Sequence, residues 1–199
     1  LFRSNDTTTF FTNAYSSTPT CTPARAALLT GKSPWHHGLL GYSPAVDCER
    51  YSTTLPSALA LWLNYQTVVV GKNHFGTKPL QTGEKESRKS TNNTQKGRRF
   101  VDHGYRHMTL YDGLNSIRDD YDEYFERELP GVDPLATCGL GWNDWMACPY
   151  QFQEYLHPTA WTTREALKAV DDYFDNPLSE DREYNSNSDN QRPVFLKVR

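Results

Sequence analysis

The hydrophobic positions of this chain mark one fully apolar strand and several segments of helical character. Residues 67–70 (TVVV) are mostly β-branched and are followed directly by Gly71 and polar side chains. An apolar run without polar alternation is typical of a strand covered on both faces, as in a parallel sheet. Helical patterns cover residues 24–29, 53–65, 115–131 and 159–175, and a polar loop leads into a last strand at residues 194–198. The order of these elements predicts an α/β protein.

The expected helix ends carry the usual start and stop residues. Thr54 is the expected N-cap of the second helix, with Pro56 in its first turn, and the third helix is expected to end at Leu129 before a proline. His157 is interpreted as a residue that starts the last helix rather than as a catalytic one. The side chains of that helix spaced for burial are Ala166, Val170, Tyr173 and Phe174.

Composition and polar segments limit the range of functions. Residues 81–99 and 179–192 are polar and are expected to form surface insertions or disordered loops. No segment approaches the ~20 apolar residues of a membrane span. The net charge of −3 gives no general reason to expect nucleic acid binding. A chain of 199 residues is long enough for one domain with a sizeable core.

Cys21 lies at the start of the first predicted helix, in the segment TPTCTPARAALLTGK. Pro23 suits a first turn and Gly31 suits the position after the last turn, so Cys21 or Thr22 is the expected N-cap. Backbone N–H groups and the helix dipole favour an anion there, and Arg25 adds a positive charge. Positive potential makes a cysteine sulfur more reactive. An ordinary buried cysteine before a core helix is the alternative.

Lys72 and His74 follow the strand at residues 67–70, in the segment GKNHFG. They are two residues apart, so an extended backbone points both side chains the same way. They would emerge where the strand ends, which is where ligands bind in open α/β sheets. An ammonium and an imidazole on one side offer an anion clamp and a proton carrier. Taken alone, a Lys-x-His pattern after a strand is a weak signal.

Together the two segments resemble the type I sulfatases, arylsulfatase-like and of the bacterial type. CTPARAALLTGK is similar to the signature Cys-x-Pro-Ser/Ala-Arg followed by an apolar helix and Thr-Gly-Arg/Lys, and GKNHFG to the second motif, Gly-Lys-x-His-x-Gly. The resemblance is continuous over residues 10–76, and the run from residue 157 onwards resembles a later helix and central strand. The departures are Ala24 for the commoner serine, Lys32 for arginine and Asn73 for a frequent tryptophan.

The resemblance implies that a separate formylglycine-generating enzyme oxidises Cys21 to Cα-formylglycine, whose hydrated aldehyde is the nucleophile. One hydroxyl attacks sulfur and expels the alcohol, which leaves a covalent sulfate ester; the second hydroxyl then loses its proton and sulfate is released. Arg25 and Lys72 are implied to hold and polarise the formylglycine oxygens, and His74 to take that proton. A divalent metal, usually calcium, is implied to bind the sulfate and residue 21, with its other ligands outside this chain.

The same resemblance implies an α/β fold with a mostly parallel central sheet sandwiched by helices, as in alkaline phosphatase and the sulfatases. Residues 67–70 and 194–198 are expected to lie in that sheet. Residues 1–199 are expected to be an internal fragment of the N-terminal catalytic domain, without the strand that bears the family's metal-binding aspartates and without the C-terminal part. The expected substrate is a sulfated small molecule or carbohydrate; aryl sulfates, sugar sulfates and choline-type esters all stay open.

Other histidines are weaker candidates. His36 and His37 precede a glycine in a loop after the first motif, and the resemblance makes them candidates for lining the pocket. His103 and His107 have the spacing of zinc ligands on a helix, but Gly104 interrupts the helix that such a site needs.

The remaining cysteines and two sequons bear on the compartment. Cys138 and Cys148 could pair if the compartment is oxidising, and Cys48 would then be free. Asn5 and Asn92 begin Asn-x-Thr sequons, which permit glycosylation of a secreted protein. These features favour a periplasmic or secretory location without establishing it.

Three other interpretations stay open. A cysteine-dependent phosphatase also uses a cysteine near a helix N-terminus and an arginine, but its loop places five residues between them, whereas Cys21 and Arg25 have three. A phosphonate or phosphodiester hydrolase of the same superfamily would share the formylglycine and the metal. A non-catalytic homologue could act as a binding protein, although all four motif residues are intact: Cys21, Arg25, Lys72 and His74.

Overall fold

The computed structural model describes residues 11–43, 51, 53–73, 104–113, 118–134, 146–175 and 193–198. The elements in chain order are α1 (Cys21–Thr30), α2 (Pro34–His37), α3 (Leu55–Trp62), β1 (Gln66–Gly71), β2 (His107–Leu110), α4 (Asp120–Glu128), the 3-10 helix η2 (Glu154–Leu156), α5 (Pro158–Asp175) and β3 (Val194–Val198). Both predicted polar insertions, near residues 81–99 and 179–192, lie outside the described residues. Within the described part, both helices and strands occur along the chain, as the sequence predicts for an α/β protein, but strand β2 was not predicted.

The described strands form one parallel sheet in the order β2-β1-β3. Val69 in β1 lies opposite Met108 of β2 on one side and Lys197 of β3 on the other. Every residue of β1 is buried, as expected for a central strand with both faces covered. The structure therefore confirms the fully buried strand and its place in one sheet with residues 194–198. Because the strands are parallel, their carboxyl ends meet at one edge of the sheet.

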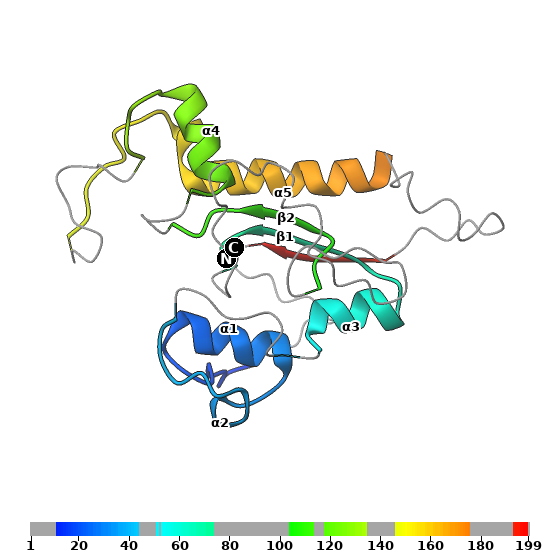
Figure 1. The fold of residues 1–199 in the computed structure, drawn as a ribbon. Coiled ribbons are helices and arrows are strands. Elements are labelled where there is room, and N and C mark those ends of the chain that lie inside the picture. The colour runs from blue at the N-terminus through cyan, green and yellow to red at the C-terminus, as the bar shows by residue number, and fades with distance from the viewer. Residues whose placement is uncertain are drawn as a thin grey trace.

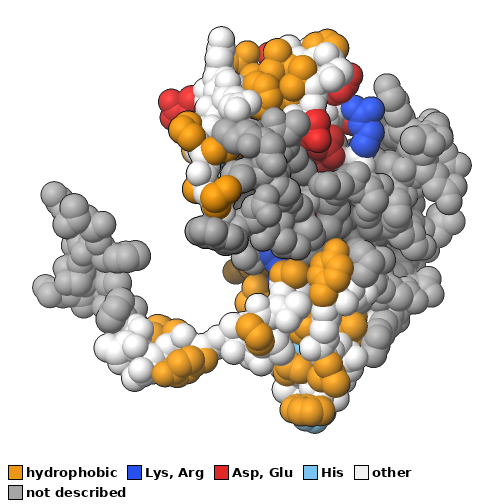
Figure 2. All heavy atoms as spheres, turned by 90° about the vertical axis from the view of Figure 1, so that its left-hand side faces the viewer, with side chains coloured by type: hydrophobic (Ala, Val, Ile, Leu, Met, Phe, Trp, Pro, Cys, Tyr) orange, Lys and Arg blue, Asp and Glu red, His pale blue; other side chains and the backbone are white. Residues whose placement is uncertain are grey.

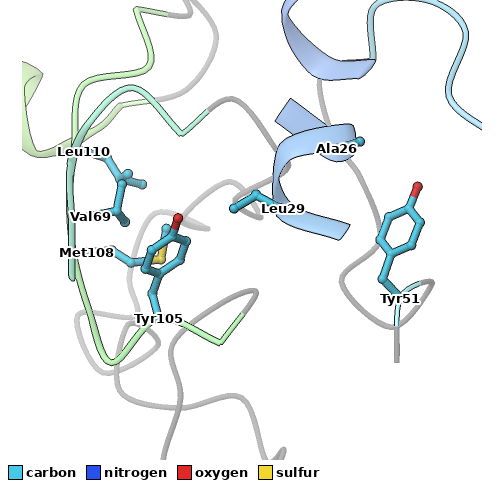
Figure 3. Packing of buried hydrophobic residues seen from close by; sticks show 7 residues of the cluster. All are labelled: Ala26, Leu29, Tyr51, Val69, Tyr105, Met108 and Leu110. Carbon is cyan, nitrogen blue, oxygen red and sulfur yellow. The ribbon is translucent and has the colours of Figure 1, made fainter. Parts of the chain in front are cut away.

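Helices cover both faces of this sheet, α1 and α3 on one side and α4 and α5 on the other (Figure 1). Side chains alternate between the two faces along β1. Val69 belongs to the cluster that includes Leu29 of α1, and Figure 3 shows Leu29 reaching from α1 towards the sheet. Val68 and Val70 point the other way and pack with Ala166 of α5. The predicted α/β sandwich is confirmed.

Helix α1 begins earlier than the sequence suggests. Its N-cap is Thr20, not Cys21 or Thr22, and Cys21 is the first helical residue. The earlier start is compatible with Pro23, because the first N–H in the helical ladder belongs to the next residue, Ala24, which donates to the Thr20 carbonyl at 3.1 Å. The other end agrees with expectation, since Gly31 adopts a left-handed conformation at the C-cap.

The other long helices follow their predicted signals with shifted ends. Thr54 caps α3 as predicted and forms a capping box with Ser57, but the helix ends at Trp62 rather than residue 65. Helix α4 begins at Asp120, later than predicted, and ends at Glu128, one residue before the predicted Leu129, which is its C-cap. No described helix has both the length and the apolar character needed to cross a membrane.

One burial prediction for α5 is wrong. Ala166 is buried, but Phe174 is 60 % exposed. Tyr173 and Phe174 are adjacent, so they lie about 100° apart around the helix and cannot both face the sheet. Tyr173 takes the partly buried position, and the two rings meet edge to face at 5.2 Å between centroids.

Candidate active site

The candidate site lies at the carboxyl edge of the sheet. Strand β1 ends there at Gly71, and Lys72 follows it directly. In Figure 1 the N-terminal end of α1, where Cys21 lies, is on the same side of the molecule as the carboxyl ends of the strands. Figure 2 looks onto this side: hydrophobic side chains gather over its lower part, around α1 and α2, and acidic side chains over its upper part, where α4 lies. The two sequence motifs therefore share one side of the fold.

Cys21 and Arg25 are placed by the first turns of α1. Cys21 is a free cysteine and is half-buried. Arg25 lies one turn further along the same helix face and is only 3 % exposed. A guanidinium stays charged at every accessible pH, and its field on a neighbouring anion is stronger where water is excluded. The start of α1 thus combines a cysteine, a helix N-terminus and a shielded cation.

Thr22 fastens the start of α1 to the chain beyond α2. Its side chain is fully buried, and its hydroxyl donates to the Ser43 carbonyl at 3.0 Å. The Ser43 N–H lies 3.4 Å from the same hydroxyl oxygen, which accepts from it. From its sequence position, Thr22 was considered only as a possible N-cap. Its observed role is to hold the residue next to Cys21 in place.

Lys72 is placed by the way β1 ends. Gly71 has φ 89°, a conformation that favours glycine, and its carbonyl accepts the Tyr111 N–H at 3.2 Å. Two residues on, the buried Asn73 donates its backbone N–H to Asp112 Oδ1 at 2.7 Å. The half-buried Lys72 lies between these two anchored residues. His74, the next motif residue, lies outside the described residues.

Residues missed by the sequence analysis join the three strand ends. Lys197 of β3 donates from Nζ to Asn73 Oδ1 at 3.1 Å. The backbone N–H of Asp112, just after β2, donates to Asp119 Oδ2 at 2.7 Å. Asp112 lies two residues past the end of β2, as Asn73 lies two residues past the end of β1, and a polar residue at such a position was a usable signal. Lys197 sits inside an otherwise apolar strand, and its sequence neighbours gave no indication of its partner.

Burial and, to a smaller extent, the nearby Asp122 carboxylate raise the pKa of the Asp119 carboxyl to about 6, although backbone N–H donors act to lower it. Asp119 is 4 % exposed and caps α4 by accepting the Asp122 N–H at 3.1 Å. The sequence signal for this cap was an aspartate three residues before another one. The end of β2 therefore rests on a carboxyl group that titrates near neutral pH.

His36 and His37 lie in the short helix α2 rather than in a loop. His37 is buried; its Nδ1 accepts the Leu39 N–H at 3.2 Å, and its carbonyl accepts the Tyr51 hydroxyl at 2.9 Å. His36 is exposed, with Nδ1 2.7 Å from the Ser33 hydroxyl. These contacts give both residues structural roles, and their place in a substrate pocket stays a prediction.

The other predicted residues divide into confirmed, corrected and undescribed ones. His157 starts α5 as expected, since its Nδ1 accepts the Thr159 N–H at 3.1 Å. His107 lies in strand β2 and not in a helix. Cys148 is disulfide-bonded. The pairing with Cys138 stays a prediction because that cysteine, like Cys48, Asn5, Asn92 and His103, lies outside the described residues.

The described residues do not form a metal site. They contain no group of three or more His, Cys, Asp or Glu side chains that could hold an ion. The calcium implied by the resemblance was expected to take its other ligands from outside this chain.

Comparison with known proteins agrees with the family resemblance seen in the sequence. The family model described as Sulfatase matches residues 2–198. An arylsulfatase of Clostridium perfringens is 29 % identical over 194 residues, which cover 94 % of this chain and 34 % of the relative. An N-acetylgalactosamine-6-O-sulfatase of Bacteroides thetaiotaomicron is 42 % identical over 72 residues, which cover 35 % of this chain and 14 % of the relative. The chain thus spans about a third of the first relative and less of the second.

Proposed function

Because the chain belongs to the sulfatase family, we propose that the protein of which it forms part hydrolyses sulfate monoesters through a formylglycine made from Cys21. The observation that carries the proposal is the placement of Cys21. It is a free cysteine at the first position of α1, one turn from the buried Arg25. It lies on the side of the molecule where β1 ends and Lys72 follows. A separate maturation enzyme would carry out the oxidation.

A hydrated aldehyde explains why a cysteine is the starting material. One hydroxyl of the hydrate attacks sulfur, an S–O bond forms, and the alcohol leaves. When the second hydroxyl loses its proton, the C=O bond reforms and sulfate departs, so no water has to attack sulfur. Water then hydrates the aldehyde again. Arg25 and Lys72 suit this sequence because two fixed cations stabilise oxygens on which negative charge develops.

The relatives are named for an aryl sulfatase and for a sulfatase of a sulfated amino sugar. We propose a sulfated aryl compound or carbohydrate as the substrate class. A phosphodiester or phosphonate ester, also singly charged, remains the competing substrate, so both ester types belong in the assay.

The direct test is the chemical state of residue 21 in the full-length native protein. A mass spectrum of the peptide that contains residue 21 should show an aldehyde, and the protein should hydrolyse a chromogenic sulfate ester much faster than the matching phosphodiester. Cys21→Ala should abolish turnover, because alanine cannot be converted to an aldehyde. An unmodified cysteine in a fully active preparation would contradict the mechanism. An unmodified cysteine in an inactive native protein would support the non-catalytic binding homologue.

A further inference from the structure

A chain of hydrogen bonds crosses the carboxyl edge of the sheet and runs through the residue next to Lys72. Lys197 of β3 donates to the side chain of Asn73, and Asn73 donates its backbone N–H to the carboxylate of Asp112 beyond β2. The second bond, at 2.7 Å, is short and charge-assisted. Asn73 is fully buried and Asp112 is 5 % exposed. The partners of Asn73 are thus supplied from both neighbouring strands.

The orientation of Asn73 follows from the chemistry of its partners. A lysine ammonium only donates, so the Asn73 atom that faces it is the amide oxygen. The carboxylate of Asp112 accepts, so it takes the backbone N–H. Both groups of Asn73 are therefore fixed in a buried environment, where a lost partner is costly. Asn73 has little freedom to rotate, and neither has the peptide that joins it to Lys72.

We propose that Asp112 and Lys197 are positioning residues that act through Asn73 to hold the Lys72 ammonium at the anion site. This inference rests on the proposed function, in which Lys72 contacts the sulfate-bearing centre. The Lys72 side chain is long and flexible, so the direction in which its stem leaves the chain decides where the ammonium is found. Gly71, at φ 89°, gives the chain freedom at the preceding residue. Asp112 and Lys197 remove that freedom on the other side of Lys72.

The test is a double-mutant cycle in the full-length protein. Asp112→Ala removes the acceptor of the Asn73 N–H and should lower kcat/KM on a chromogenic sulfate by on the order of 10- to 100-fold, as misplacement of a charged group does. Asp112→Asn keeps an oxygen that accepts this N–H and should recover most of the loss. In a Lys72→Ala background, Asp112→Ala should change kcat/KM by no more than about two-fold. A purely structural role would lower activity equally in both backgrounds.

A second readout does not depend on turnover. Inorganic sulfate binding, measured by isothermal titration calorimetry, should weaken on Asp112→Ala only while Lys72 is present. Lys197→Met keeps the length of the stem, removes the donor to Asn73 and should weaken sulfate binding in the same Lys72-dependent way. It also serves if Asp112→Ala fails to fold, which circular dichroism and a urea titration would reveal.

Thr67→Val is the matched control for a lost buried hydrogen bond. Thr67 lies near the start of β1, away from the carboxyl edge of the sheet, and is fully buried. Its hydroxyl donates to the Gly104 carbonyl at 2.9 Å. This variant should lose stability but keep kcat/KM and sulfate affinity within about two-fold.

The outcomes separate the two proposals. Losses from Asp112→Ala and Lys197→Met that persist without Lys72 would overturn the positioning role. A wild-type protein that binds sulfate with the expected Lys72-dependent pattern but hydrolyses no sulfate ester would overturn the proposed function and leave the positioning role intact. A wild-type protein that neither binds sulfate nor hydrolyses the ester would overturn both.

Discussion

Gly71 shows how a single residue prepares the site. Its φ of 89° is accessible to glycine and strained for other residues. Gly71 is the last residue of β1 that pairs with β2, and the polar residues that begin with Lys72 follow it directly. The glycine of the second motif therefore has a backbone reason: it lets the chain leave the sheet at the point where the cation is needed.

His74 is the residue whose proposed role makes the sharpest kinetic prediction. If its imidazole removes the proton of the second hydroxyl, it acts after the alcohol has left. His74→Ala should then release one equivalent of alcohol and stall with sulfate bound to residue 21, slower by about 10²- to 10⁴-fold in the second step. Burst kinetics together with intact mass would show this. A variant that is slow from its first turnover and carries no adduct would place His74 in binding or in the first step instead.

Sequence reasoning proposed candidate site residues that lie close together along the chain and missed the contacts that cross the sheet. Cys21 and Arg25 share one helix, and Lys72 follows its strand directly, so short patterns revealed them. Asp112 is 39 residues from Asn73 and Lys197 is 124 residues from it. Their contacts exist because β2 and β3 flank β1. A strand order of this kind was not predicted, so the network could not be.

At the scale of elements, the N-terminus of α4 supports the end of β2. Asp119 accepts the Asp112 N–H, and Asp120 accepts the Leu110 N–H at 2.7 Å. Carboxylates suit a helix N-terminus, where unpaired N–H groups and the dipole favour negative charge. The start of α4 therefore has two roles, because its carboxylates cap this helix and also accept hydrogen bonds from the end of β2.

The raised pKa of Asp119 makes this junction sensitive to pH. The pKa is about 6 in the fold against an ordinary 3.8, so the native state binds this proton more tightly than the unfolded state does. The resulting stability is fully present below pH ~4 and is lost as the pH rises through about 6. Asp122→Asn keeps an acceptor for the Asp119 N–H and removes a neighbouring charge that raises the pKa. The loss of unfolding free energy between pH 5 and pH 8 should therefore shrink by on the order of 1 kcal/mol.

Urea titrations of both proteins at several pH values would measure this difference. Glu123→Gln is the control, because Glu123 is an exposed carboxylate on the same helical turn. It should leave the pH profile unchanged. An Asp122→Asn protein with the wild-type profile would show that burial alone raises the pKa of Asp119.

The sequence predicted which helices are present better than it predicted the residues at which they begin and end. The Thr54 cap and the end at Leu129 carry local chemical signals that tertiary packing left in place. The start of α1 was misplaced because a proline fits any of the first three helical positions, and the structure uses the third. Burial of Phe174 was misjudged because periodicity alone does not say which of two adjacent aromatic residues faces the sheet.

At the scale of the whole molecule, two helical layers meet a sheet whose central strand is buried throughout. Helix α1, which bears Cys21 and Arg25, belongs to one layer only. Leu29 and Ala26 of α1 share a cluster with Val69, Met108 and Leu110 of the sheet. The positions of Cys21 and Arg25 relative to the strand ends therefore depend on apolar packing one to two turns further along the same helix.

Leu29→Ala should test this dependence, because Leu29 is 1 % exposed and its loss leaves a cavity between α1 and the sheet. The free energy of unfolding should fall by about 2 to 5 kcal/mol. Leu28→Ala is the matched control: the same substitution on the adjacent residue, which is 63 % exposed, should cost no more than about 0.5 kcal/mol. Urea titration of the full-length variants would compare the two, and kcat/KM at a temperature where both stay folded should fall for Leu29→Ala alone.

Equal costs for the two leucines would mean that α1 is held to the sheet by other contacts. A large stability loss with unchanged kcat/KM would mean that the placement of Cys21 and Arg25 is secured at the start of the helix, where Thr22 binds Ser43.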